Sequence, residues 1–231
     1  MCIRDSPYLE NPEPQYVFLY DLLKRSESHV VSLSDRIKKE FVARGIDSTN
    51  VSVLPCGIDT DLYTLDETDV LYPDRSIVVG KIEPRKRQSF LQHKDLNIDF
   101  IGNNADSSFD ELDPHYLGEQ SKQDIMDNLT AYASMVLLSS GEAHPFVCLE
   151  GMAAGLGLVL SEQSTANLDL HQKFITVIPD NKLNDKSFLK QKIKENRKIS
   201  LTMRKDIRKY CFDNFDWSSV IKQYKTIIDN I

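Results

Sequence analysis

The sequence has no apolar run that approaches the length of a membrane span, and no secretory signal is visible at its start. Its four cysteines are scattered, without the spacing of a metal site or a disulfide framework, which is typical of a reducing compartment. These absences predict a cytoplasmic protein. Basic residues are in the minority, since 28 Lys and Arg stand against 35 Asp and Glu, for a net charge of −7. That balance argues against bulk binding of nucleic acid, whose phosphates require a basic surface.

Internal repeats and low-complexity tracts are also missing, and the rest of the composition is that of a globular protein. With 231 residues, of which 41% are apolar, the chain is long enough for one or two domains with a substantial core. Residues 1–6 precede Pro7 without forming a recognisable element. They resemble the peptide that results when sequencing-adapter DNA is translated, so we interpret them as foreign to the gene. On this interpretation the protein is truncated at its amino end.

The most informative stretch spans residues 134–155. Its uncharged run at 135–138 predicts a buried strand, because a short apolar run followed by Ser-Ser-Gly matches strand length and turn chemistry. From Phe146 the apolar residues recur at helical spacing as far as Gly155. Pro145 suits the first turn of a helix, where its missing N–H is no loss. The stretch therefore predicts a strand, a turn and a helix.

Two glutamates, Glu142 and Glu150, stand on either side of the expected helix start. Their separation is about 12 Å if the whole segment between them is helical. Free backbone N–H groups and the positive end of the helix dipole lie between them and favour an anion. A nucleotide-diphosphate sugar fits this layout, with one carboxylate for sugar hydroxyls, the other for ribose hydroxyls and the pyrophosphate between. Such a pair also arises by chance in an acidic chain, but open α/β sheets bind ligands at the carboxyl ends of strands.

A basic loop at residues 81–87 is the second candidate. It follows an expected strand at residues 76–80 and holds four cations in seven positions, which are Lys81, Arg85, Lys86 and Arg87. Such a cluster could clamp a diphosphate, because Lys and Arg neutralise a leaving nucleoside diphosphate without a metal. A solvent-exposed basic loop explains the same residues equally well.

The rest of the chain alternates between strand and helix patterns, which predicts an α/β fold with a parallel sheet and crossover helices. Further strands are expected at residues 29–33, 97–101, 116–117, 156–160 and 174–178, and residues 51–59 are expected to form a short strand closed by a turn. Helices are expected at residues 15–25, 35–44, 122–133, 187–212 and 217–228. The acidic, polar residues 59–74 are typical of a linker into a new unit.

Three weaker signals lie elsewhere in the chain. One expected helix has a basic face, formed by Arg36, Lys38, Lys39 and Arg44. This face could make a peripheral contact with an anionic membrane, although a solvated helix face is the simpler explanation. His144 could act as a base or metal ligand, yet no second His or Cys stands at convincing ligand spacing, so no metal site is expected. Gly155 and Gly157 suggest a dinucleotide fingerprint, but they follow a helix and precede a strand, the reverse of the required order.

Taken in order, four stretches resemble the donor-binding half of a family 4 (group 1) glycosyltransferase of the GT-B fold. They run over most of the chain and comprise residues 30–34 with the helix that follows, 53–59, 79–86 and 141–155. The resemblance implies a Rossmann-like parallel sheet that forms the C-terminal domain of a GT-B fold, behind a truncated N-terminal domain. The implied division is 7–58 for the tail of the acceptor-side domain, 59–212 for the nucleotide-sugar donor domain and 213–231 for a C-terminal helix.

The resemblance also implies roles for individual residues. Glu142 would be the catalytic residue that contacts the transferred sugar, and Glu150 would bind the ribose. The family's basic pair falls on Lys81 and Lys86 at the diphosphate, with Lys at the first position, where Arg is usual. The implied donor-binding set is Gly80, Lys81, Lys86, Glu142, His144, Phe146, Val147 and Glu150. Members of the family usually need no metal, so no cofactor is expected besides the nucleotide-sugar substrate.

The implied function is that of a retaining glycosyltransferase, which transfers the sugar of a nucleotide-diphosphate donor to an unidentified acceptor. Because only the tail of the first domain is present, we expect the chain as given to bind the donor weakly without turning it over. Two rival interpretations stay open. A non-catalytic nucleotide-sugar binding module would have the same donor site, and a sugar-nucleotide epimerase on the same fold would form product without any acceptor.

Overall fold

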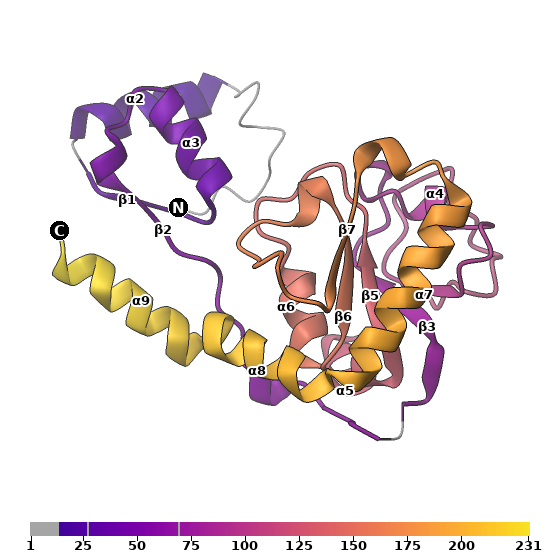
Figure 1. The fold of residues 1–231 in the computed structure, drawn as a ribbon. Coiled ribbons are helices and arrows are strands. Elements are labelled where there is room, and N and C mark those ends of the chain that lie inside the picture. The colour runs from indigo at the N-terminus through magenta and orange to yellow at the C-terminus, as the bar shows by residue number, and fades with distance from the viewer. Residues whose placement is uncertain (1–13, 27, 69) are drawn as a thin grey trace.

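A five-stranded parallel sheet forms the centre of the larger part of the molecule (Figure 1). The computed structural model describes residues 14–26, 28–68 and 70–231. The sheet order is β4-β3-β5-β6-β7, and every neighbouring pair is parallel. The strands are β3 (Tyr72–Val79), β4 (Ile98–Ile101), β5 (Tyr132–Leu137), β6 (Gly157–Ser161) and β7 (Ile175–Ile178). The α/β class with a parallel sheet, predicted from the alternating patterns, is confirmed.

Alternate residues of the strands bury opposite faces of this sheet. In β5, Met135 and Leu137 enter one hydrophobic cluster, while Val136 enters the other. The helices that close the clusters are α6 (Phe146–Ala153) and α8 (Arg204–Phe215) for the first and α7 (Lys186–Thr202) for the second. Because both faces are covered, all the residues of β5 and β6 are buried, and most of them are apolar without polar alternation. A short apolar run is therefore a dependable strand signal in this sheet.

A smaller lobe precedes the large sheet and lies beside it (Figure 1). Its elements are α2 (Pro14–Ser26), β1 (Val30–Ser32), α3 (Asp35–Ala43) and β2 (Val51–Val53). The two strands pair in parallel. Ser34 caps α3 by accepting a hydrogen bond from the Ile37 N–H at 3.5 Å, as the sequence predicts. Ile37, Phe41 and Tyr20 belong to a separate small hydrophobic cluster, which also includes Ala143 from the segment between β5 and α6.

The chain crosses between the lobe and the large sheet twice, first in the segment between β2 and β3. On the second passage α9 (Trp217–Asp229) leaves α8 and runs back toward the lobe (Figure 1). The Trp217 N–H donates to the Ile58 carbonyl oxygen at 3.0 Å. The Asp216 carboxylate accepts hydrogen bonds from the Thr60 N–H at 3.3 Å and from the Thr60 hydroxyl at 3.0 Å. The start of the segment expected to be a linker is therefore bonded to the end of α8.

The helix predicted at residues 187–212 is two helices, α7 and α8, which meet at Met203. The sequence has neither Gly nor Pro at this point. The break turns Arg204 inward, where its guanidinium donates to the carbonyl oxygens of Thr130 and Tyr132. Tertiary hydrogen bonds therefore accompany the end of α7, and helix propensity carries no signal of them.

Other predicted limits differ from the observed ones by a few residues, because contacts between elements decide where each element ends. α5 (Lys122–Asn128) ends at Asn128, and β3 begins at Tyr72. An isolated bridge from Tyr116 to Phe100 stands in place of the strand expected at 116–117. The short strand expected within residues 51–59 is β2. A further short helix is α4 (Gln88–Leu91). Residues 1–6, interpreted as foreign, lie outside the described part of the chain.

Arg44, one of the four residues of the basic face at α3, contacts other residues of the chain. Arg44 Nη1 donates to Glu40 Oε2 at 2.5 Å, and the Arg44 guanidinium lies 4.9 Å from the centre of the Tyr20 ring. Lys38 and Lys39 form no ion pair with another described residue. Within the described ranges, none of the helices is both long enough and apolar enough to cross a membrane.

Candidate functional site

The loops that follow β3 and β4 lie in direct contact at one edge of the sheet. Parallel strands run in one direction, so their carboxyl ends share this edge. The Gly80 N–H, after β3, donates to the Ile101 carbonyl oxygen of β4 at 2.9 Å. A Cβ placed on Gly102 would lie 2.1 Å from the Gly80 carbonyl oxygen. The two loops approach this closely because Gly102 has no side chain.

Glu142 is held by a guanidinium from the loop after β3. Arg85 Nη1 donates to Glu142 Oε1 at 3.1 Å, and Arg85 Nη2 donates to Glu83 Oε1 at 2.7 Å. Arg85 Nη1 also donates to the Gly141 carbonyl oxygen and thereby joins the loops after β3 and β5. The Glu142 side chain is 15% exposed, and its Oε2 accepts no hydrogen bond from a described residue. One oxygen of a fixed carboxylate is therefore open.

Lys86 lies directly over Gly80. Its Nζ would be 2.8 Å from a Cβ placed on that glycine, so the ammonium group occupies space that any other residue would fill. Gly80 also has φ 132°, a conformation that L side chains rarely adopt. Lys81 is exposed in the same loop. Among the described residues, neither Lys81 nor Lys86 has an ion-pair partner, so both charges are open to an anion.

The structure brings Glu142, Glu150 and Lys86 to the first turns of α6. The buried thiol of Cys148 in this helix responds to all three charges. Burial raises the pKa of Cys148, the two carboxylates raise it further, and Lys86 opposes them. The helix begins after Pro145, which provides no side-chain cap, so its first N–H groups are left for water or a ligand.

Glu150 is nearly buried and has two partners that the sequence patterns do not reveal. Its Oε1 accepts hydrogen bonds from the Tyr63 hydroxyl at 3.0 Å and from Lys122 Nζ. Lys122 Nζ also lies 5.6 Å from the centre of the Phe146 ring. Burial raises the pKa of Tyr63, and the Glu150 carboxylate adds to this effect, so the phenol stays a hydrogen-bond donor. Glu150 Oε2 accepts no hydrogen bond from a described residue.

The sequence patterns indicate the three side-chain partners of Glu142 and Glu150 to different degrees. Arg85 belongs to the basic loop, although the resemblance assigns the diphosphate to its two lysines. Lys122 begins a predicted helix, where a lysine is ordinarily solvated. Tyr63 lies in residues 59–74, whose composition is typical of a linker. Only Arg85 could have been found from the pattern.

His144 contributes to the contact with the smaller lobe. Its Nδ1 lies 2.9 Å from Asn167 Nδ2, which also donates to the Leu33 carbonyl oxygen at 2.7 Å. Burial lowers the pKa of His144, and its Nε2 is buried without a hydrogen-bond partner in the described part of the chain. Of the next two implied donor-binding residues, Phe146 is 40% exposed at the start of α6, and Val147 packs against the larger core cluster.

A pocket of about 350 Å³ opens at the ends of β3 and β4. Residues from three segments line it, and they include Gly80, Lys81, Gly102, Asn103, Gln120 and Ile125. This volume lies in the range of small-molecule sites. Throughout the described residues, no group of three or more His, Cys, Asp and Glu side chains is arranged to hold a metal ion. The pocket adjoins the exposed Lys81, so a ligand can reach from it to the basic loop.

Known proteins match this chain in structure and not in sequence. No protein-family model and no curated protein matches the sequence. Among solved structures, the chain is similar to HepE of Anabaena in complex with UDP and glucose, with a TM-score of 0.73 and 18% sequence identity. This similarity covers 98% of the present chain and 69% of HepE.

Two further solved structures show the same fold. Sucrose-phosphate synthase from Thermosynechococcus elongatus has a TM-score of 0.69 at 16% identity, over 97% of this chain and 63% of that protein. The lipopolysaccharide outer core galactosyltransferase WaaB, in its apo form, has a TM-score of 0.68 at 16% identity, over 92% of this chain and 66% of that one. At such identities the likeness is one of fold. The chain has the α/β architecture of GT-B glycosyltransferases and spans 63 to 69% of the length of these three proteins.

Proposed function

We propose that the chain is the donor-binding half of a retaining family 4 glycosyltransferase, which binds a nucleotide-diphosphate sugar and passes the sugar to an acceptor. The observation that carries this proposal is the arrangement at the start of α6. Glu142 precedes this helix and is held by Arg85, Glu150 lies within it and is held by Tyr63, and Lys86 lies over Gly80 on the adjoining loop. HepE, which shares the fold, was solved with UDP and glucose, and this supports a nucleotide sugar as the ligand class.

In the proposed complex the diphosphate lies against the start of α6. The open N–H groups and the helix dipole attract its oxygens. Lys86 adds a charge from the space above Gly80, and the exposed Lys81 adds another. When the bond between the sugar and the phosphate breaks, negative charge grows on the leaving diphosphate. These preorganised groups stabilise that charge without rearranging, which lowers the barrier.

The two carboxylates bind the two ends of the donor through their open oxygens. Glu150 Oε2 accepts the ribose hydroxyls, since Oε1 is occupied by Tyr63 and Lys122. Glu142 Oε2 accepts hydroxyls of the transferred sugar, and Arg85 holds that carboxylate in place. The nucleobase enters the pocket at the ends of β3 and β4, whose volume of about 350 Å³ is sufficient for a base.

Calorimetric titration of the 231-residue chain with a panel of nucleotide sugars tests this proposal. We expect one of them to bind, and we expect Glu150→Gln to weaken that binding by about tenfold, because a charge-assisted hydrogen bond is lost. Asp213→Asn is the matched control, since this carboxylate pairs with Lys209 at 2.7 Å on the surface of α8. The proposal is wrong if no nucleotide sugar binds, or if both variants bind as tightly as the unmodified chain.

The same preparation separates the enzyme from its rivals. We propose that the 231-residue chain binds the donor without transferring the sugar, and measurable transfer to an acceptor would contradict this. An epimerase would convert the bound donor when no acceptor is present, which chromatography of the nucleotide sugars would detect. A binding module would give tight association with a donor but no chemistry with any acceptor, even in a longer form of the protein.

A further inference from the structure

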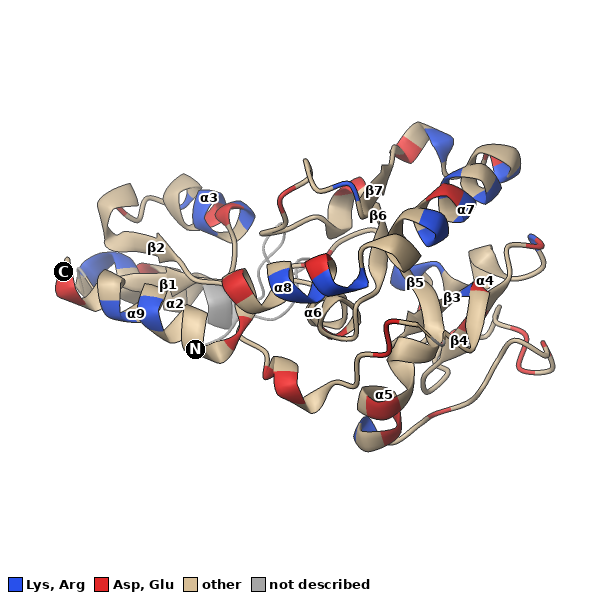
Figure 2. Cartoon of the chain, turned by 60° about the horizontal axis from the view of Figure 1, so that its bottom comes forward, with Lys and Arg blue, Asp and Glu red and all other residues tan. Residues whose placement is uncertain are grey.

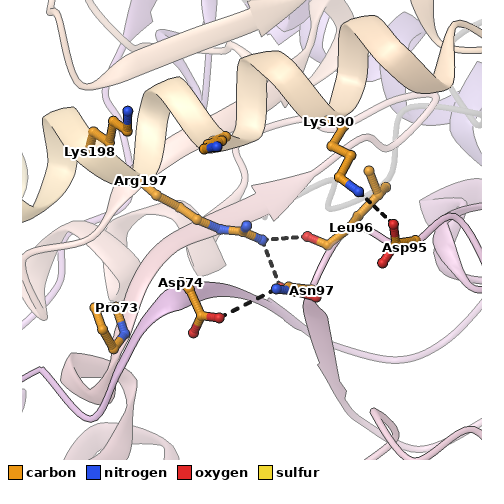
Figure 3. Close-up of a pocket in the computed structure, with 9 residues that line it drawn as sticks. Pro73, Asp74, Asp95, Leu96, Asn97, Lys190, Arg197 and Lys198 are labelled. Atoms are coloured by element: carbon orange, nitrogen blue, oxygen red, sulfur yellow. Dashed lines mark hydrogen bonds and ion pairs between the residues drawn. The ribbon is translucent and has the colours of Figure 1, made fainter.

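A second pocket lies at the opposite edge of the sheet, where β3 and β4 begin (Figure 3). Its volume is about 330 Å³. The walls are the first residues of β3, the turn at 95–97 before β4, and one face of α7. The four residues of β4 lie between Asn97 of this pocket and Gly102 of the donor loops, a separation of about 16 Å. A ligand in this pocket is therefore distinct from the nucleotide sugar.

One face of α7 makes the pocket basic. Lys190, Lys194 and Lys198 recur every four residues and all line the pocket, and blue positions recur along α7 in Figure 2. Lys190 pairs with Asp95 at 2.5 Å, whereas Lys194 and Lys198 form no ion pair with any described residue. Like charges at this spacing repel each other. An anion between the two unpaired ammonium groups would relieve that repulsion.

Carboxylates reduce this positive charge without cancelling it. Asp95 is engaged by Lys190, and Asp74 accepts a hydrogen bond from Asn97 Nδ2 at 3.5 Å. Four of the side chains that line the pocket are cations and two are carboxylates, so the pocket carries an excess of two positive charges. A phosphate monoester carries a charge of about −1.5 to −2 at neutral pH, which matches this excess.

The fourth cation, Arg197, is rigid and nearly buried. Its Nε donates to Ser76 Oγ at 2.9 Å, and its Nη2 donates to the carbonyl oxygens of Leu96 at 2.5 Å and Asn97 at 2.7 Å. These bonds hold the plane of the guanidinium, which Figure 3 shows extending from α7 to the turn before β4. Nη1 makes no hydrogen bond with a described residue. Burial lowers the pKa of Arg197 to about 10, although the nearby carboxylates of Asp74 and Asp99 act in the opposite direction.

We propose that this pocket binds a phosphate-bearing anion, with Arg197 Nη1 as a fixed donor and the ammonium groups of Lys194 and Lys198 as mobile counter-charges. A guanidinium held in one plane matches the geometry of phosphate oxygens. The flexible lysine side chains can place their ammonium charges close to the same oxygens. The volume leaves room for a group attached to the phosphate. A free phosphorylated metabolite and a lipid headgroup share this chemistry.

Titration of the isotope-labelled 231-residue chain, followed by nuclear magnetic resonance, tests the proposal in two arms. Inorganic phosphate probes a free ligand, and vesicles of phosphatidylcholine with or without phosphatidic acid probe a headgroup. We expect saturable shifts of the backbone amides at residues 95–97 and 190–198 in at least one arm. The arm that produces them identifies the source of the phosphate.

Two single-charge variants of α7 distinguish a pocket from general attraction. Lys194→Gln removes an unpaired cation of the pocket and should weaken the binding by about tenfold. Lys192→Gln removes a lysine of the same helix that lies outside the lining and pairs with Glu195 at 2.8 Å, and it should change the affinity by less than about twofold. Equal losses in the two variants, or shifts at 95–97 and 190–198 in neither arm, would overturn the proposal.

Discussion

Arg85 at one edge of the five-stranded sheet and two buried arginines at the other are held in different ways. At the carboxyl edge, Arg85 reaches a carboxylate, with 3.1 Å between Arg85 Nη1 and Glu142 Oε1. At the amino edge, the guanidinium groups of Arg197 and Arg204 are buried and donate to backbone carbonyl oxygens of neighbouring elements. Burial lowers the pKa of both Arg197 and Arg204, and the attraction of nearby carboxylates opposes this shift only in part.

This difference separates a binding edge from a supporting edge. Side-chain carboxylates can keep one oxygen for a ligand while the other holds a cation, as Glu142 and Glu150 do. Backbone carbonyl groups cannot move without moving their strands, so an arginine bound to them stabilises the fold. The amino edge departs from this rule at Arg197, whose Nη1 is left without a described partner beside two unpaired lysines.

The largest effect is expected where two loops of the binding edge meet. Gly102→Ala would place a Cβ 2.1 Å from the Gly80 carbonyl oxygen at a φ of 149°, and we expect it to lower the free energy of unfolding by about 3 kcal/mol. Urea denaturation measures this loss. Gly118→Ala is the control, because its φ is 73° but its Cβ would meet nothing within 4 Å, and it should lose about 1 kcal/mol. Similar losses would show that the loop contact is unimportant.

The supporting edge is tested through Arg204. Arg204→Met leaves the carbonyl oxygens of Thr130 and Tyr132 without their donor, and we expect a loss of about 2 kcal/mol in the free energy of unfolding. Lys205→Met removes the neighbouring cation, whose side chain is 73% exposed, and should lose no more than about 0.5 kcal/mol. Equal stability of the two variants would show that the hydrogen bonds from Arg204 to carbonyl oxygens do not stabilise the fold.

A smaller, pH-dependent effect is expected at His144, between the two lobes. Burial lowers the pKa of His144 from its ordinary value of 6.5, so the unfolded chain binds this proton more readily than the folded protein does. The contribution of His144 to stability is therefore complete above pH 6.5 and is lost as the pH falls through the lowered pKa, by at most about 1.4 kcal/mol per pH unit.

Urea denaturation at a series of pH values measures this contribution. His144→Asn should remove that part of the pH dependence, while His171→Asn, at an exposed histidine, should keep it. Parallel stability curves for the unmodified protein and His144→Asn would contradict the prediction.

The smallest effect concerns the orientation of Glu150. Tyr63→Phe removes one of the two donors to Glu150 Oε1 and leaves the other, Lys122, in place. We expect nucleotide-sugar affinity to fall by about threefold, as measured by calorimetry, because the carboxylate is less firmly held. Tyr72→Phe, at a tyrosine that begins β3 on the supporting edge, should bind the donor as the unmodified chain does. Unchanged affinity in Tyr63→Phe would mean that Lys122 alone orients Glu150.

The fold was largely predictable because its signals are local. The apolar run at 135–138 is a strand signal by itself, since both faces of the sheet are covered. Helical spacing after Pro145 places α6, which begins at Phe146 as expected. The break between α7 and α8 had no such signal, because the hydrogen bonds of Arg204 reach carbonyl groups more than 50 residues away.

The candidate site shows the same division. Spacing along one segment suffices to place Glu142 and Glu150 around a helix start, and the glycine before a basic loop is visible in the sequence. The roles assigned to Lys81, Lys86 and His144 stay predictions. The partners of the two glutamates were hidden, since Tyr63 lies 87 residues from Glu150 and reaches it only through the packing of the chain.

Residue order alone therefore indicates most of the strands and helices and the charges at their ends, since these depend largely on neighbours a few positions away. Folding in three dimensions selects which charge meets which, because distant segments are brought together by the burial of their apolar faces. That selection joins Arg85 to Glu142 and leaves Lys194 and Lys198 unpaired among the described residues, although all are ordinary charged residues in the sequence.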